Sequence, residues 1–444
     1  MTLMSHHLPR PAQHHPNVLL IHCHDLGHMV GCYGGNSAQT PHLDALAAQG
    51  ALFDRHFACA PQGSPSRAGM YTGLHPNRHG LMGLSNEGVW NLKPELPNVV
   101  TVMRTLGYWP LQVGIFHIGI EPFNYGFEES LRPHDPDEIA LAAIHGLEKR
   151  PRDRRFFAVV GFFEAHRPYQ PKGIPLQAPE SILVPPYLVD CPEGREELAR
   201  FFGEVSRIDR AVGTILRWLD GQALGPETLV IFTTDHGIAM PLAKGTLYDP
   251  GLETALIMRW LGMIPEGRRI ECLTSNVDFF PSLLSAIEAQ DFLPFGLDGK
   301  DFWPAVVGGT CPMRQQIFAE ITWHDFYQPM RCIRTETHKL IRNFTPGMGL
   351  QIPSDVLLSP FTRANREVLR TWPRPEYELY DLESDPLERH NLAGKPEVAA
   401  IEKDLKARLQ MRLEYAKDPI LQGYVQPPPG YERILEKWRG GLPE

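Results

Sequence analysis

The sequence lacks the features that would point to a membrane or to nucleic acid. No apolar run in its 444 residues approaches the roughly 18 residues that a membrane-spanning helix needs. There is no long run of Lys or Arg, and the formal net charge is −9. This balance disfavours nucleic acid and anionic membranes as partners. A protein of this charge that handles an anionic substrate must place positive charge locally, through a metal ion or a few cations.

The sequence also lacks a cysteine framework, and its first residues are not expected to form a leader segment. Its seven cysteines stand at scattered spacing, with no disulfide pattern and no paired metal-binding spacing. Residues 1–17 are rich in His and Pro and contain no apolar core, so they do not resemble a secretory signal. We therefore expect reduced thiols and a cytoplasmic location.

Buried strands alternate with amphipathic helices as far as residue 310. Near-continuous apolar runs at 18–23, 156–163 and 229–234 are typical of strands that are covered on both faces. Helices are expected at 40–47 and 196–219. This alternation predicts an α/β fold with a mostly parallel, doubly wound sheet.

Beyond residue 310 the segments become shorter and alternate in polarity, which favours an antiparallel sheet followed by a helix at 398–416. The last segment carries several apolar side chains, and we expect it to pack on its own domain or to join a second subunit in a homo-oligomer. The expected organisation is an N-terminal tail (1–15), an α/β catalytic domain (16–310), a C-terminal α+β subdomain (311–417) and a C-terminal arm (418–444).

Ionisable residues follow three of the buried strands. The first strand ends in His24 and Asp25, and the strand at 229–234 ends in Asp235 and His236. Glu164 and His166 follow the strand at 156–163. Ligands of open α/β sheets gather at such strand ends, and carboxylate and imidazole groups bind divalent metals. His24 and Asp25 are adjacent, so a turn is needed to bring both to one ion.

Residues 61–73 read Pro-Gln-Gly-Ser-Pro-Ser-Arg-Ala-Gly-Met-Tyr-Thr-Gly. This stretch, with residues 16–27, 40–44, 234–237, 244–248 and 379–392, resembles sulfatases of the alkaline phosphatase superfamily. The similarity runs from about residue 16 to residue 415, and residues 41–85 most resemble the branch that includes heparan N-sulfatases. The resemblance implies an alkaline-phosphatase-like α/β fold with a smaller C-terminal α+β domain, and a metal-dependent sulfuric ester hydrolase.

The resemblance also implies roles for single residues. One divalent metal ion, calcium in the family, would lie between the strand-end pairs named above. Arg67 would support the nucleophile position at Gly63 and the bound oxyanion. The substrate's sulfate would contact His117, His166 and Lys244, and a histidine there can protonate the leaving oxygen.

Three positions depart from the family pattern. Gly63 stands where a cysteine or serine is oxidised to the formylglycine nucleophile. Ile115 replaces a sulfate-binding lysine, and His24 replaces the first of two aspartates. Two Asp and two His form a mixed N/O donor set that suits Zn or Mn better than Ca, with a second ion left open. His22 is either a further ligand or a hydrogen-bonded core residue.

Four explanations of Gly63 stay open. A one-residue slip could present Ser64 as the nucleophile, a metal ion could activate water, or a formylglycine could be recorded under a parent glycine letter. The fourth is a non-catalytic anion-binding homologue. The water hypothesis predicts single-displacement kinetics and strict metal dependence.

The substrate is expected to be a small anionic molecule, namely a sulfate ester or sulfamate of a sugar or other organic compound. A phosphodiester or phosphonate monoester on the same site is the alternative, because an Asp-His pair also resembles the phosphodiesterase side of the superfamily. Complete retention of the other site residues argues against a decayed enzyme, since unpaired buried polar groups cost stability.

Overall fold

The computed structural model describes residues 15–85, 88–311 and 314–439. Its centre is an eight-stranded sheet made of β1 (Asn17–Cys23), β2 (Ala51–Phe53), β4 (Trp109–Gly114), β5 (Glu129–Leu131), β6 (Phe156–Gly161), β7 (Thr228–Thr234), β8 (Leu256–Arg259) and β9 (Arg268–Ile270). The strand order is β5-β4-β6-β1-β7-β8-β2-β9. The strands from β5 to β7 are parallel, whereas β8 is antiparallel to both of its neighbours. The sheet confirms the predicted mostly parallel α/β class.

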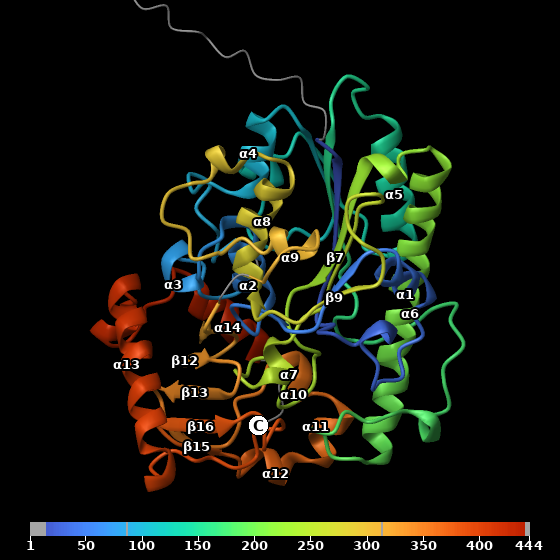
Figure 1. The fold of residues 1–444 in the computed structure, drawn as a ribbon. Coiled ribbons are helices and arrows are strands. Elements are labelled where there is room, and N and C mark those ends of the chain that lie inside the picture. Colours follow the sequence, from blue (N-terminus) through green and yellow to red (C-terminus); the bar gives the residue numbers. More distant parts are fainter. Residues whose placement is uncertain (1–14, 86–87, 312–313, 440–444) are drawn as a thin grey trace, which may run out of the picture.

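Helices cover both faces of this sheet (Figure 1). One layer contains α1 (Pro41–Ala48), α5 (Pro136–Glu148) and α6 (Pro192–Gly221), and the other contains α2 (Gly63–Thr72), α4 (Val99–Thr105) and α8 (Phe279–Ala286). Along β1, Leu19 and Ile21 pack into the first layer, while Val18 and Leu20 pack into the second. The alternation explains why the four consecutive residues Val18 to Ile21 are all apolar. None of the described helices combines the length and apolarity of a membrane-spanning segment.

The C-terminal part forms a second, antiparallel sheet, as predicted. Its strands are β11 (Ile317–Trp323), β12 (Tyr327–Arg334), β13 (His338–Asn343) and β16 (Tyr377–Asp381), in that order. Helix α13 (Ala399–Ala416) packs Leu405, Leu409 and Leu413 against this sheet. Short elements complete the fold: α3 (Pro76–His79), α7 (Asp249–Leu252), α9 (Trp303–Val306), α10 (Ser354–Leu357), α11 (Pro360–Ala364), α12 (Arg366–Arg370), β3 (His56–Phe57), β10 (Thr274–Ser275), β14 (Gly347–Met348) and β15 (Pro373–Arg374).

The described part of the C-terminal arm packs on its own chain. Asp418 accepts hydrogen bonds from the buried Arg331 guanidinium. In α14 (Tyr431–Arg439), the Tyr431 hydroxyl donates to the His324 carbonyl and its ring lies edge-on to Trp323. These contacts support the first of the two expected roles, and association with a second subunit stays a prediction. The expected N-terminal tail lies outside the described residues except for residue 15.

The sequence predicts one strand at 51–57 and a helix that begins after Arg67, and both boundaries differ in the structure. The segment 51–57 is not one strand, because it breaks at Asp54 and continues as β3, which pairs with β10 outside the main sheet. Helix α2 begins at Gly63 rather than after Arg67. Pro65 lies in the first turn of α2, where a missing backbone N–H costs no hydrogen bond, so the helix can start earlier than the sequence indicated.

A disulfide joins Cys272 and Cys311, so the expectation that all thiols are reduced is wrong. The two residues are separated by 39 positions, and such a distance leaves no spacing signal in the sequence. Five cysteines stay free: Cys23, Cys32, Cys59, Cys191 and Cys332. Because stable disulfides are rare in the cytosol of most organisms, one ground for a cytoplasmic location is lost, and that location stays a prediction.

Replacing both Cys272 and Cys311 with serine is expected to lower the free energy of unfolding by about 4 kcal/mol, because the open chain regains loop entropy. Urea unfolding of the variant and of the oxidised wild type measures the difference. Cys32→Ser serves as the control, since this half-buried thiol is free. Equal unfolding midpoints, together with seven titratable thiols in denatured wild-type protein, would contradict the disulfide.

Candidate active site

Neighbouring strand ends bring the two predicted acid–imidazole pairs together. Strands β1 and β7 are paired in parallel, with Cys23 opposite Thr234. The residues that follow, His24 with Asp25 and Asp235 with His236, therefore emerge side by side. Asp25 adopts a left-handed backbone conformation (φ 52°), which supplies the turn that the sequence required. All four side chains are buried.

One metal-ligating atom from each of these four residues faces the same small volume. We call His24, Asp25, Asp235 and His236 the donor cluster. The Nδ1 atom of His24 lies 2.7 Å from Asp235 Oδ2 and 3.3 Å from Asp25 Oδ1. The Nε2 atom of His236 lies 3.1 Å from Asp25 Oδ1 and 3.7 Å from Asp235 Oδ2. A tetrahedral donor set around a cation with bonds of about 2.0–2.2 Å has edges of about 3.3–3.6 Å. The separations in the cluster bracket that range.

The hydrogen bonding of His236 fits a cation in this cluster. Its Nδ1 atom lies 2.9 Å from the Gly237 carbonyl, which can only accept, so Nδ1 carries the proton. In the neutral imidazole Nε2 then carries a lone pair, which faces Asp25 Oδ1 at 3.1 Å, and neither of these buried atoms has a geometric hydrogen-bond partner among the described residues. Two facing lone pairs repel each other unless a positive charge lies between them. A backbone carbonyl on the other ring nitrogen is also typical of metal-binding histidines.

The cluster holds its groups in the protonation states that bind metals. Burial opposes ionisation of Asp25, but Lys244 and His24 outweigh it and lower the pKa of this carboxyl well below its usual value. Burial likewise opposes ionisation of Asp235, whose pKa is nevertheless lowered by His236 and Arg67. Burial lowers the pKa of His24 to about 4. Two carboxylates and a neutral imidazole therefore face one another near neutral pH.

Gly63 lies at the first residue of α2 and faces the donor cluster. A Cβ atom at this position would lie 2.7 Å from His24 Cε1, 2.9 Å from Arg67 Nη1 and 3.0 Å from Asp235 Oδ2. The His24 ring therefore fills the space into which a side chain at residue 63 would point. Two of the three departures from the family pattern, Gly63 and His24, therefore adjoin each other, and an imidazole occupies the space beside Gly63.

Arg67 is almost fully buried and joins α2 to the cluster. Its Nη2 atom lies 3.1 Å from Asp235 Oδ2, and its Nη1 donates to His117 Nδ1 over 3.1 Å. His117 follows β4, adopts a positive φ of 59° and lies 5.4 Å from His24 between ring centroids. Both residues thus reach the site, Arg67 from α2 and His117 from the segment after β4.

His166 also reaches the site, whereas Glu164 does not. The His166 ring lies 5.0 Å from that of His24, and its Nε2 lies 3.6 Å from Asp355. Glu164 points instead toward Arg207, at 4.0 Å. Burial raises the pKa of the Glu164 carboxyl to about 7. The apolar run at 156–163 predicted that both Glu164 and His166 would lie at the edge of the sheet. Only His166 turns toward the donor cluster.

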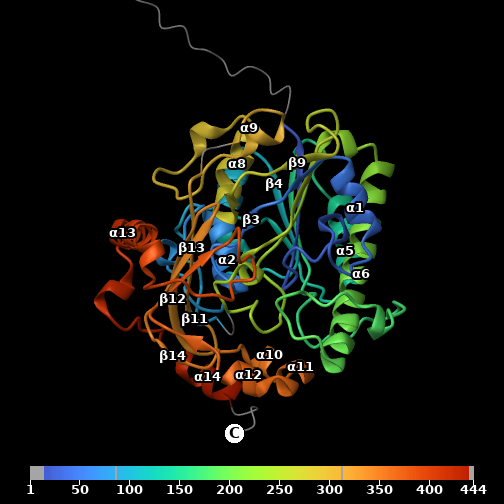
Figure 2. The same ribbon diagram turned by 60° about the horizontal axis from the view of Figure 1, so that its bottom comes forward.

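Lys244 is not a free sulfate ligand in this structure. Its ammonium donates to Asp25 Oδ2 and to Asp355 Oδ2, both over 2.8 Å, and its side chain is 4% exposed. Asp355 lies on α10 (Ser354–Leu357), which is labelled near the bottom of the view in Figure 2. Asp355 could not be predicted from local sequence, because no buried strand precedes it and it lies 111 residues from Lys244.

Asp355 also belongs to a second group of possible metal ligands, with Asp25 and His166. The Lys244 ammonium already contacts both carboxylates of this group. The Lys244 ammonium therefore supplies the positive charge that a second metal ion would otherwise supply between Asp25 and Asp355. A second metal ion stays a prediction.

Replacing Lys244 with alanine is expected to lower kcat/KM by about tenfold to a hundredfold, while bound metal is retained. Lys244 contacts Asp25 through Oδ2, whereas Oδ1 faces the donor cluster, so the ligand atoms persist. Kinetics and metal analysis of the variant test this, with Lys172→Ala, an exposed loop lysine, as the control. Wild-type kinetics would assign Lys244 a purely structural role.

Two further candidate residues, Ser64 and His22, have defined positions in the structure. Ser64 is buried and its Oγ accepts a hydrogen bond from the Ser85 backbone N–H at 2.9 Å, so it gives no support to the one-residue slip. His22 is buried and neither ring nitrogen has a hydrogen-bond partner. His22 is therefore not a hydrogen-bonded core residue as the second alternative required. It is also absent from the groups of side chains that could hold a metal among the described residues.

Comparisons with known proteins show the family of this chain. A family model described as Sulfatase matches residues 16–289. The human N-sulphoglucosamine sulphohydrolase is 28% identical over 454 residues, which cover 88% of this chain and 89% of that protein. Human arylsulfatase A is 28% identical over 471 residues, which cover 92% of this chain and 91% of that protein.

A solved structure shares the fold. The phosphonate monoester hydrolase of Agrobacterium radiobacter superposes with a TM-score of 0.70 at 21% identity, covering 92% of this chain and 97% of that one. Since the family model spans more than half of the sequence, the motifs, the sheet and the strand-end site lead to one conclusion. The chain is a hydrolase that belongs to the sulfatase family.

Proposed function

We propose that this chain hydrolyses a sulfate ester or sulfamate of a small sugar or other organic molecule, without a side-chain nucleophile at residue 63. The contact between the start of α2 and the donor cluster carries the proposal. Gly63 lies beside His24 and Asp235, and Arg67 contacts Asp235. The residue that takes the family's nucleophile position therefore lies against the donor cluster. The similarity to N-sulphoglucosamine sulphohydrolase supports a sulfamate or sulfated sugar as the substrate class.

The ion would be held by the strand-end pairs, His24 with Asp25 and Asp235 with His236. Bound there, a divalent cation supplies a Lewis acid that lowers the pKa of water from 15.7 to about 7. The two imidazoles in the set suit Zn or Mn better than Ca, which takes oxygen ligands. The Gly237 carbonyl accepts a hydrogen bond from Nδ1 of His236 and so orients the imidazole, as is typical of metal-binding histidines.

The chain's own groups provide anion binding and a proton. The buried Arg67 guanidinium and the N-terminus of α2 place positive charge beside Gly63, where a sulfate oxygen would lie. Because Arg67 donates to Nδ1 of His117, the neutral imidazole carries its proton on Nε2. His117 then donates this proton to the leaving oxygen or nitrogen. Lys244, which Asp355 holds in place, keeps Asp25 in its ionised form.

The proposal is tested first by mass spectrometry of the tryptic peptide 56–67. Unmodified glycine at residue 63 is expected, together with aryl sulfate turnover that stops on chelation and returns with Zn or Mn. A formylglycine mass or a trapped covalent intermediate would restore the family's covalent route. Absence of turnover, with anion binding that survives metal removal, would establish the non-catalytic homologue.

Hydrolysis of a phosphodiester or phosphonate monoester on the same site is the second candidate. The two imidazoles in the ligand set favour it, because a mixed N/O set also suits the metals of phosphoryl-transfer enzymes. A panel of aryl sulfate, diaryl phosphate and aryl phosphonate separates the two candidates. Faster turnover of the phosphorus esters, compared as kcat/KM, would favour the second.

A further inference from the structure

Phe163 presents an exposed aromatic ring beside the buried donor cluster. This residue is 38% exposed, whereas His24 is 3% exposed. The ring centroid of Phe163 lies 5.9 Å from that of His24 and 4.7 Å from that of His166, whose side chain is 22% exposed. An apolar ring therefore lies where the polar site meets solvent. Such a ring forgoes the stabilisation that burial gives, which makes it a candidate for contact with the substrate.

Backbone pairing places this ring on the face of the sheet that α2 covers. Val159 packs in the core cluster of that face, and Gly161 and Phe163 follow it at steps of two residues. The ladder to β1 continues past the end of β6, because the Phe162 N–H donates to the His22 carbonyl over 2.9 Å. Residues two apart on an extended strand face the same side. Phe163 therefore lies on the side of the sheet from which α2 contacts the donor cluster.

Ile115 adds a second apolar side chain at the neighbouring strand end. Strands β4 and β6 pair in parallel, with Gly114 opposite Gly161, and the half-buried Ile115 follows β4. A Cβ atom at Gly161 would lie 2.9 Å from Ile115 Cγ2, so this side chain reaches the same face as Phe163. We call Ile115 and Phe163 the apolar wall. The wall brings no charge to the site, so a substrate should present a neutral, apolar surface to it.

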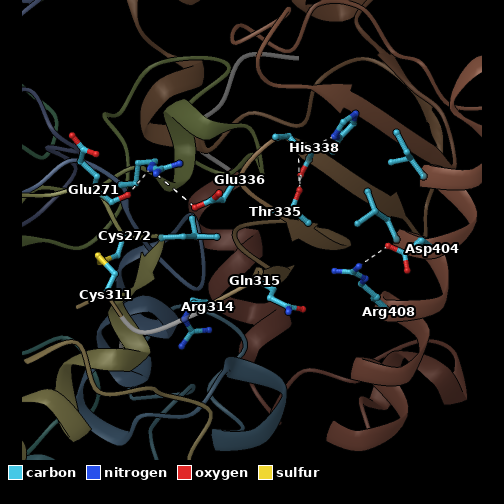
Figure 3. Close-up of a pocket in the computed structure, with 15 residues that line it drawn as sticks. Glu271, Cys272, Cys311, Arg314, Gln315, Thr335, Glu336, His338, Asp404 and Arg408 are labelled. Atoms are coloured by element: carbon cyan, nitrogen blue, oxygen red, sulfur yellow. Dashed lines mark hydrogen bonds and ion pairs between the residues drawn. A yellow bond between two sulfur atoms is a disulfide. The ribbon is translucent and has the colours of Figure 1, made fainter. Parts of the chain in front are cut away.

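The charged hollow in Figure 3 differs from this arrangement. It measures about 890 Å³ and is lined in part by the Cys272–Cys311 disulfide. Its three arginines are already paired with carboxylates, as Arg408 is with Asp404 at 2.8 Å. No member of the donor cluster is among its described lining residues. This hollow therefore has no link to the candidate active site, whereas the apolar wall adjoins it.

We propose that Phe163 determines substrate specificity, and that its exposed ring stacks on the ring that bears the sulfate or sulfamate group. Stacking requires a flat apolar face, which the C–H face of a sugar or an aromatic ring provides. Ile115 borders the same ring, while the anionic group lies toward Arg67 and the donor cluster. This inference rests on the proposed function, because the anion must bind at that cluster.

The test is calorimetric titration of the metal-loaded protein with two sulfonates, benzenesulfonate and methanesulfonate. Both carry the anionic group on a carbon–sulfur bond, which hydrolysis of a sulfate ester does not break, but only the first has a ring. Wild type is expected to bind benzenesulfonate more tightly. Phe163→Ala is expected to weaken benzenesulfonate binding by about fivefold to tenfold and to leave methanesulfonate binding unchanged. Phe163→Tyr keeps a ring and should keep the wild-type affinities.

Phe292→Ala is the matched control, because it removes a ring that is 50% exposed on the segment after α8 and outside the candidate site. It should change neither affinity. A glucose derivative with a sulfonate on its terminal carbon separates the two sources of the ring. Tighter binding than that of benzenesulfonate supports a sugar, and weaker binding supports an aromatic ring.

An unchanged benzenesulfonate affinity in Phe163→Ala would overturn the inference. An equal loss for both sulfonates would do the same, because Phe163 would then only support His166. If Phe163→Ala melts early, wild-type crystals grown with benzenesulfonate decide instead, and a ligand ring farther than about 7 Å from Phe163 between centroids would overturn it. Because these probes are not hydrolysed, ring-dependent binding without turnover of aryl sulfate would refute the proposed function alone. Turnover with ring-independent binding would refute only this inference.

Discussion

Replacing Asp235 with alanine is expected to remove the bound metal and to lower kcat/KM by more than about a hundredfold. Asp235 organises the whole cluster. Its Oδ2 contacts His24 and Arg67, while its Oδ1 accepts hydrogen bonds from the backbone N–H groups of Asp25, at 3.0 Å, and His236, at 2.9 Å. Its loss therefore removes one ligand and the hydrogen bonds that orient the other three. Metal analysis and steady-state kinetics measure both effects.

The same variant leaves Arg67 buried without its carboxylate, which costs about 3–5 kcal/mol. A matched control separates this instability from the loss of metal. Asp418→Ala removes the hydrogen-bonded carboxylate of another fully buried arginine, Arg331, far from the cluster, and should keep its metal and its kcat. Metal content of Asp235→Ala equal to that of wild type would place the ion elsewhere.

Replacing Gly63 with alanine is expected to lower kcat/KM by about a hundredfold and the free energy of unfolding by about 1–3 kcal/mol. The new methyl group would lie 2.7 Å from His24 Cε1. The imidazole would have to move, and it would leave its position against Asp235. Kinetics and urea unfolding of the variant measure these effects.

A double-mutant cycle tests the cause. In a His24→Ala background the methyl group no longer meets the ring, so the stability cost of Gly63→Ala should become smaller. An unchanged cost would assign the strain to Arg67 or to the helix itself. If Gly63→Ser gained activity, a missing side-chain nucleophile rather than the His24 ring would be the reason for the glycine.

The strand-end pairs were predictable from local sequence. The segments 18–23 and 229–234 are almost continuously apolar, with only His22, Thr233 and Thr234 as exceptions, which occurs where a strand is buried on both faces. Polar residues that follow such a strand must lie at the edge of the sheet. The class of fold, the C-terminal antiparallel sheet and the proximity of Asp25 to Asp235 follow from this pattern and from the family motifs.

Other features depend on side chains that approach from distant segments. The sequence placed Lys244 against the substrate's sulfate, but Asp355, from a four-residue helix in the C-terminal part, pairs with it. Short helices have no periodicity that could reveal such a carboxylate. Cys272 and Cys311 come together for the same reason, through two loops whose approach no spacing encodes.

The sequence alone determined which chemical groups reach the candidate site, because strand ends and the start of α2 deliver them by local rules. Only the tertiary structure decided how these groups pair. It placed the His24 ring in the space above Gly63, engaged Lys244 with two carboxylates and turned Glu164 away. The partner of each side chain depends on packing between segments that are far apart in the sequence. That packing forms only when the two sheets and their helices come together.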